Sequence, residues 1–352
     1  MVWNNVNLIS WNVNGINNKV KSYKILMHLK SLGCNIAMIQ ETHLNEVESL
    51  RLKQRWVGQV FFSPGMIRNA RGMCILIAKR ISFQLNELFT DKKGRFLILS
   101  GTLKNVKFVL VNIYAPNTGQ VTFLTSLCPL LSKFSDLPMV TGGDFNLVLE
   151  PEVDRSNHPL PSDRSLSSAF SEFPSTLGLV DVWCMLNTVS REYTFYSKIH
   201  NSHSRIDHFI ISNHMLENVI NCQIQNIIIS DHAPVVLSIV LADRQAIKRT
   251  WKFNNFLLRD EEFVSLIKNR ISEFITLNEY SVPSIQTVWE AFKVTCRGWI
   301  ISYSTAKKKQ RIEKKHKLQI LLKDLECKHM ENPKDLKLRI EKRIIFSKEN
   351  KR

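Results

Sequence analysis

The sequence of 352 residues contains no run of about 18 consecutive apolar residues, the length that a membrane-spanning helix requires. Met1 leads almost directly into a strand-like segment, so the pattern offers no cleavable signal peptide. The seven cysteines are scattered and never spaced as Cys-x-x-Cys, which argues against a disulfide framework and against a structural zinc site. We therefore expect a monomeric protein of the nucleus and cytoplasm, without membrane contact and with reduced thiols.

Acidic residues are few relative to basic ones, and the formal net charge is +17. Residues 241–352 alone carry +12 of this charge. A basic excess favours a polyanionic partner, because binding releases condensed counterions. Nucleic acid is the commonest such partner, although an anionic membrane surface produces the same signature.

Up to about residue 241, short β-branched runs alternate with amphipathic stretches of helical length, which is typical of a mixed α/β domain. We expect strands at residues 6–11, 35–40, 73–78, 96–102, 106–114, 138–141, 206–211 and 235–241, and helices at about 20–32, 45–54, 120–134 and 164–177. Several of these strands are apolar on both faces, so we expect sheets that are covered on both sides.

Beyond residue 241 the apolar spacing becomes helical, over 260–277, over 284–303 and again from Lys307 onward. This pattern predicts a first domain of residues 1–241 and a basic α-helical extension of residues 242–352. The lysine run that begins at Lys307 is either a solvated helix face or a patch for nucleic-acid contact or nuclear import, and both remain open.

Polar side chains follow apolar strands at six places along the first domain. They are Asn12 with Asn14, Glu41, Tyr114, Asp144 with Asn146, Asp207, and Asp231 with His232. In layered α/β folds the ligand site forms at strand ends, so we expect these side chains to converge on one site.

The chemistry of this set fits metal-assisted hydrolysis of a phosphodiester. Mg²⁺ prefers hard oxygen ligands, so the Glu41 carboxylate and the Asn12 amide oxygen would hold it against a phosphate. There the ion would polarise the phosphoryl oxygen and stabilise charge on the leaving oxygen. Asp144 follows two glycines, which allow close approach of backbone and substrate, and it would orient or deprotonate the attacking water beside Asn146.

His232 is the candidate donor to a non-bridging phosphate oxygen. A carboxylate such as Asp207 would fix its tautomer and favour its cationic form. A single histidine is more often structural than catalytic, and Glu41, Asp144, Tyr114 or Asn12 taken alone would each fit a surface, turn or core role.

Taken together, these blocks resemble in order the signature blocks of the endonuclease/exonuclease/phosphatase superfamily, over roughly residues 6–241. The blocks are Asn12, QET at 40–42, NIYAPN at 112–117, GDFN at 143–146, YTF at 193–195, IDH at 206–208 and SDH at 230–232. Within that superfamily the chain most resembles the endonuclease domain of LINE-type retrotransposons (long interspersed nuclear elements).

The resemblance implies a four-layer α/β sandwich, in which two packed mixed β-sheets are flanked by helices, followed here by the basic helical extension. It implies an enzyme that uses Mg²⁺, with Mn²⁺ as a substitute, to nick one strand of double-stranded DNA. The nick would leave a 3′-hydroxyl that primes reverse transcription.

The resemblance also implies roles for single residues. Asn12 and Glu41 belong to the metal site, Asp144 and Asn146 handle the nucleophile, and Tyr114 contacts the scissile phosphate.

By the same resemblance, Asp207 supports His232, and Asp231 completes the polar cluster near metal and phosphate. Asn14 stands where the abasic-site repair branch has an aspartate, which favours the LINE branch.

DNA contact is implied for four residues outside the catalytic set. They are Asn14, Arg155, Thr194 and Arg205, of which Thr194 begins a stretch similar to a hairpin that probes the minor groove. For Arg155, Thr194 and Arg205, ordinary surface or turn roles remain open.

The extension begins with WKFNNFLL at 251–258, which is similar to the segment that links endonuclease to reverse transcriptase in these elements. No Tyr/Phe-x-Asp-Asp polymerase signature occurs in the chain. The basic C-terminal region is a candidate contact for element RNA. Two rival readings remain: a related enzyme that acts on abasic DNA or a phosphoinositide, and an inactive remnant that only binds nucleic acid.

Overall fold

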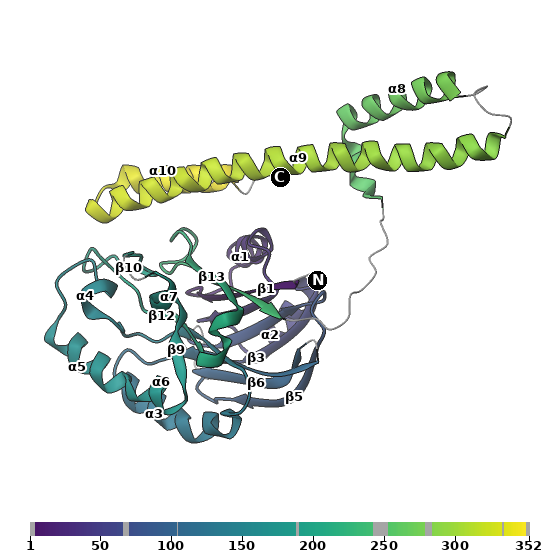
Figure 1. Ribbon diagram of the computed structural model, residues 1–352. Helices are drawn as coiled ribbons and strands as arrows, with labels where there is room; N and C mark the ends of the chain where they lie inside the picture. Colours follow the sequence, from purple (N-terminus) through teal and green to yellow (C-terminus); the bar gives the residue numbers. More distant parts are fainter. Residues whose placement is uncertain are drawn as a thin grey trace. The chain divides into compact units, whose positions relative to one another are not determined.

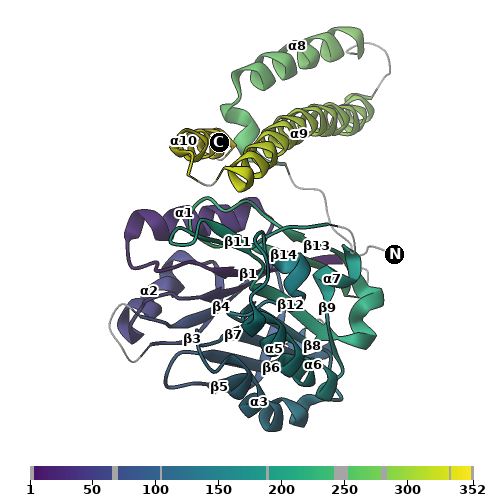
Figure 2. The same cartoon turned by 90° about the vertical axis from the view of Figure 1, so that its left-hand side faces the viewer.

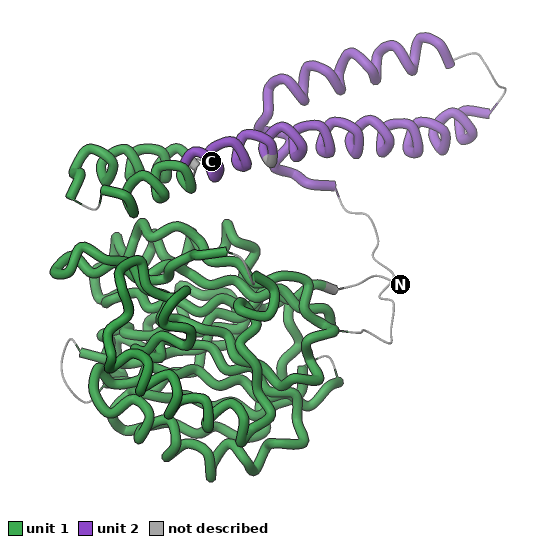
Figure 3. The backbone as a smooth tube through the Cα atoms, turned by 60° about the vertical axis from the view of Figure 1, so that its left-hand side comes forward, with its two compact units in different colours: residues 1–246, 322–352 green, residues 247–321 purple. Residues whose placement is uncertain are grey.

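The computed structural model describes residues 4–65, 70–103, 105–187, 190–241, 253–278, 284–332 and 334–349. The chain divides into two compact units, one of residues Met1–Ala246 with Leu322–Arg352 and one of residues Ile247–Leu321 (Figure 3). The predicted domain boundary at 241 lies close to the end of the first segment. Residues 322–352, predicted as extension, belong to the first unit, while Trp251 and Lys252 of the linker-like segment lie outside the described residues.

Two six-stranded mixed sheets form the centre of the first unit (Figures 1 and 2). The first sheet has the order β13 (Val219–Ile224), β14 (Val235–Leu241), β1 (Asn4–Asn12), β2 (Ile36–Gln40), β4 (Met73–Ala78), β3 (Gly58–Ser63). The second sheet has the order β5 (Phe83–Thr90), β6 (Phe96–Leu103), β7 (Val106–Tyr114), β8 (Met139–Asp144), β12 (Asp207–Ser212), β9 (Leu179–Asp181). A separate hairpin pairs β10 (Phe195–Ser197) with β11 (Ser202–Ser204).

The central strands are buried on both faces, and this places four layers in sequence. In β1, Val6 and Leu8 face the other sheet, where their cluster includes Phe108 and Leu110 of β7. The alternate residues Ile9 and Trp11 face outward, into a cluster shared with the helix α1 (Lys19–Ser31). The outer face of the second sheet packs in the same way against α3 (Gln120–Leu131). The four-layer α/β sandwich is therefore confirmed, and so are sheets covered on both sides.

Shorter helices complete the outer layers and the connections of the first unit. They are α2 (Glu46–Arg55), α4 (Pro151–Asp154), α5 (Pro161–Phe170), α6 (Glu172–Thr176) and α7 (Val182–Leu186), with 3₁₀ turns η1 (Ser132–Phe134) and η2 (Asn213–Asn218). The helix expected at 164–177 is two helices, which meet at Ser171. All eight expected strands are present. The strands β3, β5, β9 and β13 and the two strands of the hairpin were not predicted from the sequence.

The second unit is helical, as expected. The 3₁₀ turn η3 (Asn255–Arg259) leads into α8 (Glu261–Asn278), which pairs with the first part of α9 (Ile285–Glu331). The ring of Phe274 on α8 contacts Phe292 and Trp299 of α9, with ring centroids 5.5 and 6.2 Å away. Phe292 and Trp299 thus pack α9 against α8. The helix α10 (Leu336–Glu349) follows α9 and belongs to the first unit.

No helix in the described part of the chain combines the length and the apolarity needed to cross a membrane.

Candidate active site

Strand register brings the polar residues of both sheets to one edge of the sandwich. In the first sheet the parallel strands β1 and β2 align Asn12 with Gln40, so Glu41 follows directly. In the second sheet β7 and β8 are parallel and align Tyr114 with Asp144. The antiparallel strand β12 starts at the same edge, where Asp207 pairs with Asp144. The expected convergence of strand ends is therefore present.

The buried Asn12 amide links the two sheets at this edge. Its Nδ2 donates to Glu41 Oε1 at 3.0 Å and to Asp144 Oδ2 at 2.9 Å, so two carboxylates share one hydrogen-bond donor. Its oxygen accepts a hydrogen bond from the Asn14 backbone N–H at 3.1 Å. The amide nitrogen, and not the oxygen expected to bind metal, therefore faces the two acids.

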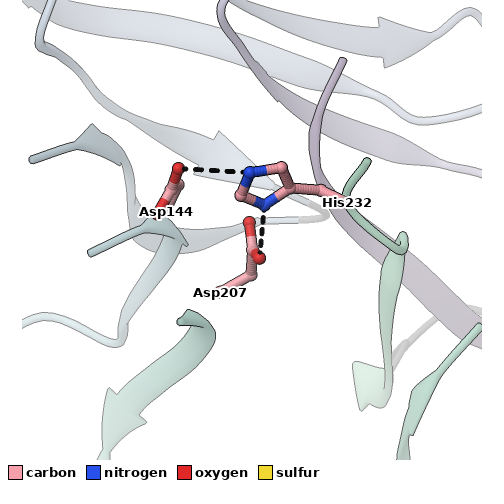
Figure 4. A group of neighbouring side chains, drawn as sticks. All are labelled: Asp144, Asp207 and His232. Atoms are coloured by element: carbon pink, nitrogen blue, oxygen red, sulfur yellow. Dashed lines mark hydrogen bonds and ion pairs between the residues drawn. The ribbon is translucent and has the colours of Figure 1, made fainter. Parts of the chain in front are cut away.

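Asp144, Asp207 and His232 form a buried group at this edge of the sandwich (Figure 4). His232 Nδ1 lies 2.8 Å from Asp207 Oδ2, while Nε2 on the other side of the ring lies 3.9 Å from Asp144 Oδ2. The backbone of His232 is held as well, because Trp11 Nε1 donates to its carbonyl oxygen at 3.0 Å. Phe195 lies against the ring, with centroids 4.7 Å apart.

Burial and charge shift both protonation equilibria in this group. Burial lowers the pKa of His232, but the carboxylates of Asp207 and Asp144 outweigh it and raise this pKa to about 10. Burial, followed by the nearby Asp207 carboxylate, raises the pKa of Asp144 to about 7. The imidazole is therefore cationic at neutral pH, and Asp144 has the affinity for protons that a general base requires.

The turn after β8 is built so that Asp144 meets the end of β7. A Cβ atom on Gly143 would lie 2.0 Å from the Ile113 carbonyl oxygen, so the close packing of the two strands requires glycine there. Asn146 has a positive φ of 50°; its backbone N–H donates to Asp144 Oδ1 at 2.9 Å, and its Nδ2 donates to the Ala115 carbonyl at 2.8 Å. Asn146 thus fixes the rotamer of Asp144.

Tyr114 and Glu41 form the neighbouring part of the site. Burial, followed by the Glu41 carboxylate, raises the pKa of the Tyr114 hydroxyl well above its usual range, so the phenol stays protonated. Glu41 is half-buried, and its second oxygen lies 3.1 Å from His43 Nε2. Glu41 therefore contacts the side chains of Asn12, His43 and Tyr114, while part of its carboxylate stays open to solvent.

Asp231 and Asn14 lie on the exposed rim. Asn14 Nδ2 donates to both Asp231 carboxylate oxygens, at 3.3 and 3.2 Å. Ser230 Oγ also donates to Asp231. The rim residues are thus joined to each other, next to the buried group and not inside it.

Two residues expected to contact DNA are enclosed in the protein. The side chain of Arg205 has no exposed surface and donates to Asp154 and Asp181, at distances of 2.7 to 3.0 Å. Thr194 is also buried, and its Oγ1 accepts hydrogen bonds from the backbone N–H groups of Ile206 and Asp207. A side chain without exposed surface has nothing to offer a nucleic acid, so this structure corrects both expectations. Arg205 and Thr194 position the start of β12.

Arg155 is only partly exposed, and its charge is paired with an acid. Its guanidinium donates to both oxygens of Asp163, at 2.6 and 2.7 Å, and its side chain is 28% exposed. A DNA contact by Arg155 remains a proposal.

Sequence reasoning gave no role to the polar pair that lies between the sheets below the site. Gln40 Nε2 donates to Asn112 Oδ1 at 2.7 Å, and Asn112 Nδ2 in turn donates to the carbonyls of Ile39 and Cys74. Both side chains are fully buried, in an interface that is otherwise apolar. A polar residue inside an apolar strand, as in VLVNIY at 109–114, was the available signal.

The fold and the site together define a class of α/β sandwich proteins with a carboxylate and imidazole centre at the strand ends. The sequence matches the profile of the Endonuclease/Exonuclease/phosphatase family over residues 9–232. The chain therefore belongs to this family, which is named for enzymes that hydrolyse phosphate esters.

Two curated relatives differ in how much of their own length is matched. The chain is 30% identical over 312 residues to the "Transposon TX1 uncharacterized 149 kDa protein" of Xenopus laevis, an alignment that covers 85% of this chain and 23% of that protein. It therefore spans about a quarter of this relative. It is 23% identical over 257 residues to an exodeoxyribonuclease of Bacillus subtilis, covering 66% of this chain and 98% of that protein.

Solved structures with the same fold include an AP endonuclease, LMAP, from Leishmania major, with a TM-score of 0.58 and 18% identity over 68% of this chain and 88% of that one. The catalytic domain of APE2 from Xenopus laevis matches with a TM-score of 0.57 and 17% identity, over 68% and 94% of the two chains. At this identity the likeness concerns the fold.

Proposed function

We propose that the chain is the endonuclease part of a LINE-type retrotransposon protein, which nicks one strand of double-stranded DNA with the help of Mg²⁺ or Mn²⁺. The nick would leave a 3′-hydroxyl as primer for reverse transcription. The observation that carries the proposal is the convergence of Glu41, Asp144 and the cationic His232 at one edge of this fold. The similarity to the transposon protein supports the element assignment, because it covers 85% of the chain and so extends beyond the family match at 9–232.

The site has the donor set that a hard divalent ion requires. Glu41 Oε1 and Asp144 Oδ2 both lie within 3.0 Å of Asn12 Nδ2, so carboxylates from the two sheets converge on one neutral amide donor. Mg²⁺ takes one or two carboxylates and keeps several waters, which the open side of Glu41 allows. We therefore propose Glu41 as the principal ligand with Asn12 beside it. When bound, the ion would neutralise charge on the phosphoryl group.

A second set of ligand atoms belongs to Asp144, Asp207 and His232, which lie within 4.8 Å of one another. A histidine must be neutral to coordinate a metal, and the raised pKa of His232 favours its cation. This group is therefore better suited to proton transfer and phosphate binding than to holding the metal.

Roles of the remaining side chains follow from their positions. Asp144, held by Asn12 and Asn146, would accept the proton of the attacking water. The His232 cation, held by Asp207, would donate from Nε2 to a non-bridging phosphate oxygen and stabilise the charge that develops there. Tyr114, which stays protonated, would donate to the same phosphate.

The test is conversion of supercoiled plasmid to the open-circular form by the full chain. We expect nicking with Mg²⁺ or Mn²⁺ and none with EDTA. Asp144→Asn should lower the rate by about 10²–10⁴-fold, since it removes a general base. The matched control Asp136→Asn changes an exposed acid in the loop before β8 and should nick like the unmodified chain. Unimpaired nicking by Asp144→Asn would contradict the site assignment.

Substrate class is tested with intact duplex, abasic duplex and phosphoinositide under identical conditions. The proposal expects turnover of intact duplex. Turnover confined to abasic DNA or to the lipid headgroup would assign the chain to another branch of the family, and metal-independent binding without cleavage would indicate an inactive remnant.

A further inference from the structure

The end of α9, from Leu322, and the helix α10 pack against the sandwich of the first unit next to the candidate active site. Glu326 Oε1 accepts a hydrogen bond from the Ile227 backbone N–H at 3.0 Å, and Lys342 Nζ donates to the same oxygen at 3.0 Å. Leu322 and Leu325 of α9 are buried. The His329 ring lies 4.9 Å from the ring of Tyr196 in the hairpin strand β10. The end of α9 and the helix α10 are therefore part of the unit that carries the catalytic residues (Figure 3).

This packing encloses a cavity of about 210 Å³ that opens beside the rim of the site. Asn14 and Asp231, the hydrogen-bonded rim pair, are part of its wall. Lys21 of α1 also lines it, and its Nζ donates to the Asn14 carbonyl at 2.7 Å. The cavity therefore borders the candidate active site through the rim residues Asn14 and Asp231.

Positive charge in this cavity comes from both parts of the first unit. Lys21 and Lys198 contribute from the sandwich, and Arg339 and Arg343 from α10, against the single acid Asp231. Among the residues that the structure describes, Lys198, Arg339 and Arg343 form no ion pair. Burial lowers the pKa of Lys21, the carboxylates of Asp231 and Glu41 act against this, and the charge of Lys198 lowers the pKa further.

Lys342 provides the contrast. It also reaches the cavity wall, but its charge is neutralised by Glu326. The helix α10 is thus anchored through one basic residue while the two arginines one turn apart, at 339 and 343, remain available. Guanidinium groups suit phosphate because their planar donors bind two oxygens at once.

We propose that this cavity binds a phosphate of the DNA backbone next to the scissile one, with Arg339 and Arg343 of α10 as its ligands from the extension. This inference rests on the proposed function, because it takes the occupant of the adjoining site to be DNA. The cavity is smaller than a site that encloses a whole small-molecule ligand, for which about 300–1,000 Å³ is usual, and it suits one phosphate with part of its sugar. The extension would then be a direct part of the DNA-binding surface.

The experiment measures binding of labelled duplex DNA to the full chain in EDTA, so that no cleavage occurs, over a range of salt concentrations. The double variant Arg339→Gln/Arg343→Gln should bind roughly tenfold more weakly at physiological salt, and the slope of log K against log salt should fall by about one for the phosphate lost. The control Lys337→Gln/Lys348→Gln removes the same charge from α10 at exposed positions that do not line the cavity. This control should change the slope less than Arg339→Gln/Arg343→Gln does.

The conservative pair Arg339→Lys/Arg343→Lys keeps the charge and should restore the slope. A glutamine pair that binds like the control, or a lysine pair that binds as weakly as the glutamine pair, would overturn the phosphate contact. Because binding is measured without cleavage, a chain that binds in this way but never nicks would contradict the proposed function and leave this inference intact.

Discussion

Asp207→Asn separates the charge of the Asp–His pair from its geometry. Asparagine keeps an oxygen that accepts from His232 Nδ1, where Asp207 Oδ2 now lies at 2.8 Å, but it removes the negative charge. The pKa of His232, now about 10, owes its rise to Asp207 and Asp144 acting against burial. With the larger of the two charges gone and burial unchanged, we expect this pKa to fall to about the ordinary 6.5. The cationic fraction at about pH 8 then falls roughly 30-fold.

The assay is the pH dependence of plasmid nicking. In the unmodified chain the rate should rise as Asp144 loses its proton near pH 7 and fall as His232 loses its proton near pH 10. The Asp207 charge raises both of these pKa values, so the variant should lose about 30-fold at pH 8 and have its optimum at least about one pH unit lower. Asp136→Asn serves as the control. An unchanged optimum, or an equal loss at every pH, would refute the electrostatic role and leave Asp207 with an orienting role.

Three further predictions concern the metal, the fold and its acid stability. Glu41→Gln should raise the Mg²⁺ concentration for half-maximal nicking at least tenfold, and an unchanged requirement would place the ion elsewhere. Arg205→Met removes the buried guanidinium that pairs with Asp154 and Asp181, and it should destabilise the protein by about 3–5 kcal/mol in thermal unfolding. A stable variant with weakened DNA binding would instead support a DNA contact by Arg205. Burial, followed by the charges of His329 and Lys342, lowers the pKa of His203 to about 3. Between pH 6.5 and 3 the unfolded chain therefore binds one more proton than the folded chain. The free energy of unfolding then falls as the pH falls, by up to about 1.4 kcal/mol per pH unit. His203→Gln should flatten this acid slope, and an equal slope would exclude His203 as its source.

The inner strands and the meeting of their polar ends could be predicted because both depend on local pattern. A strand such as β7 is apolar on both faces, and a polar residue at its end lies at the sheet edge whatever the details of packing. Asn12, Glu41, Asp144, Asp207 and His232 are therefore brought together as the sequence indicated. Their roles as metal ligand, base and donor remain proposals.

Edge strands could not be predicted in the same way. Nearly every residue of β5 is exposed, and β13 is buried at a single position, so neither has the apolar run that signals a strand. Their β structure comes from pairing with β6 and β14, which is information that lies elsewhere in the chain.

The environment of Arg205 shows the same limit at a single residue. Its partners Asp181 and Asp154 lie 24 and 51 residues away in sequence, and nothing near Arg205 distinguishes it from a surface arginine. The placement of residues 322–352 is a similar case, because the buried Leu322 and Leu325 occur in the same lysine-rich helical pattern as the exposed Ile320 and Leu321.

Backbone strain adds evidence about the site that neither composition nor periodicity contains. Seven non-glycine residues in the described part of the chain have positive φ, and four of them, Asn14, Glu41, His43 and Asn146, lie at the candidate active site. Asparagine tolerates this conformation, but for Glu41 and His43 it is unfavourable, by an amount on the order of 1–3 kcal/mol each. The positive φ angles at Glu41 and His43, on either side of Thr42, accompany hydrogen-bond contacts of the Glu41 carboxylate to Asn12 on one side and to His43 on the other. A segment that only connects β2 with α2 could have glycine or asparagine at these positions at lower cost, so the strain supports the proposal that Glu41 is placed there to present its carboxylate.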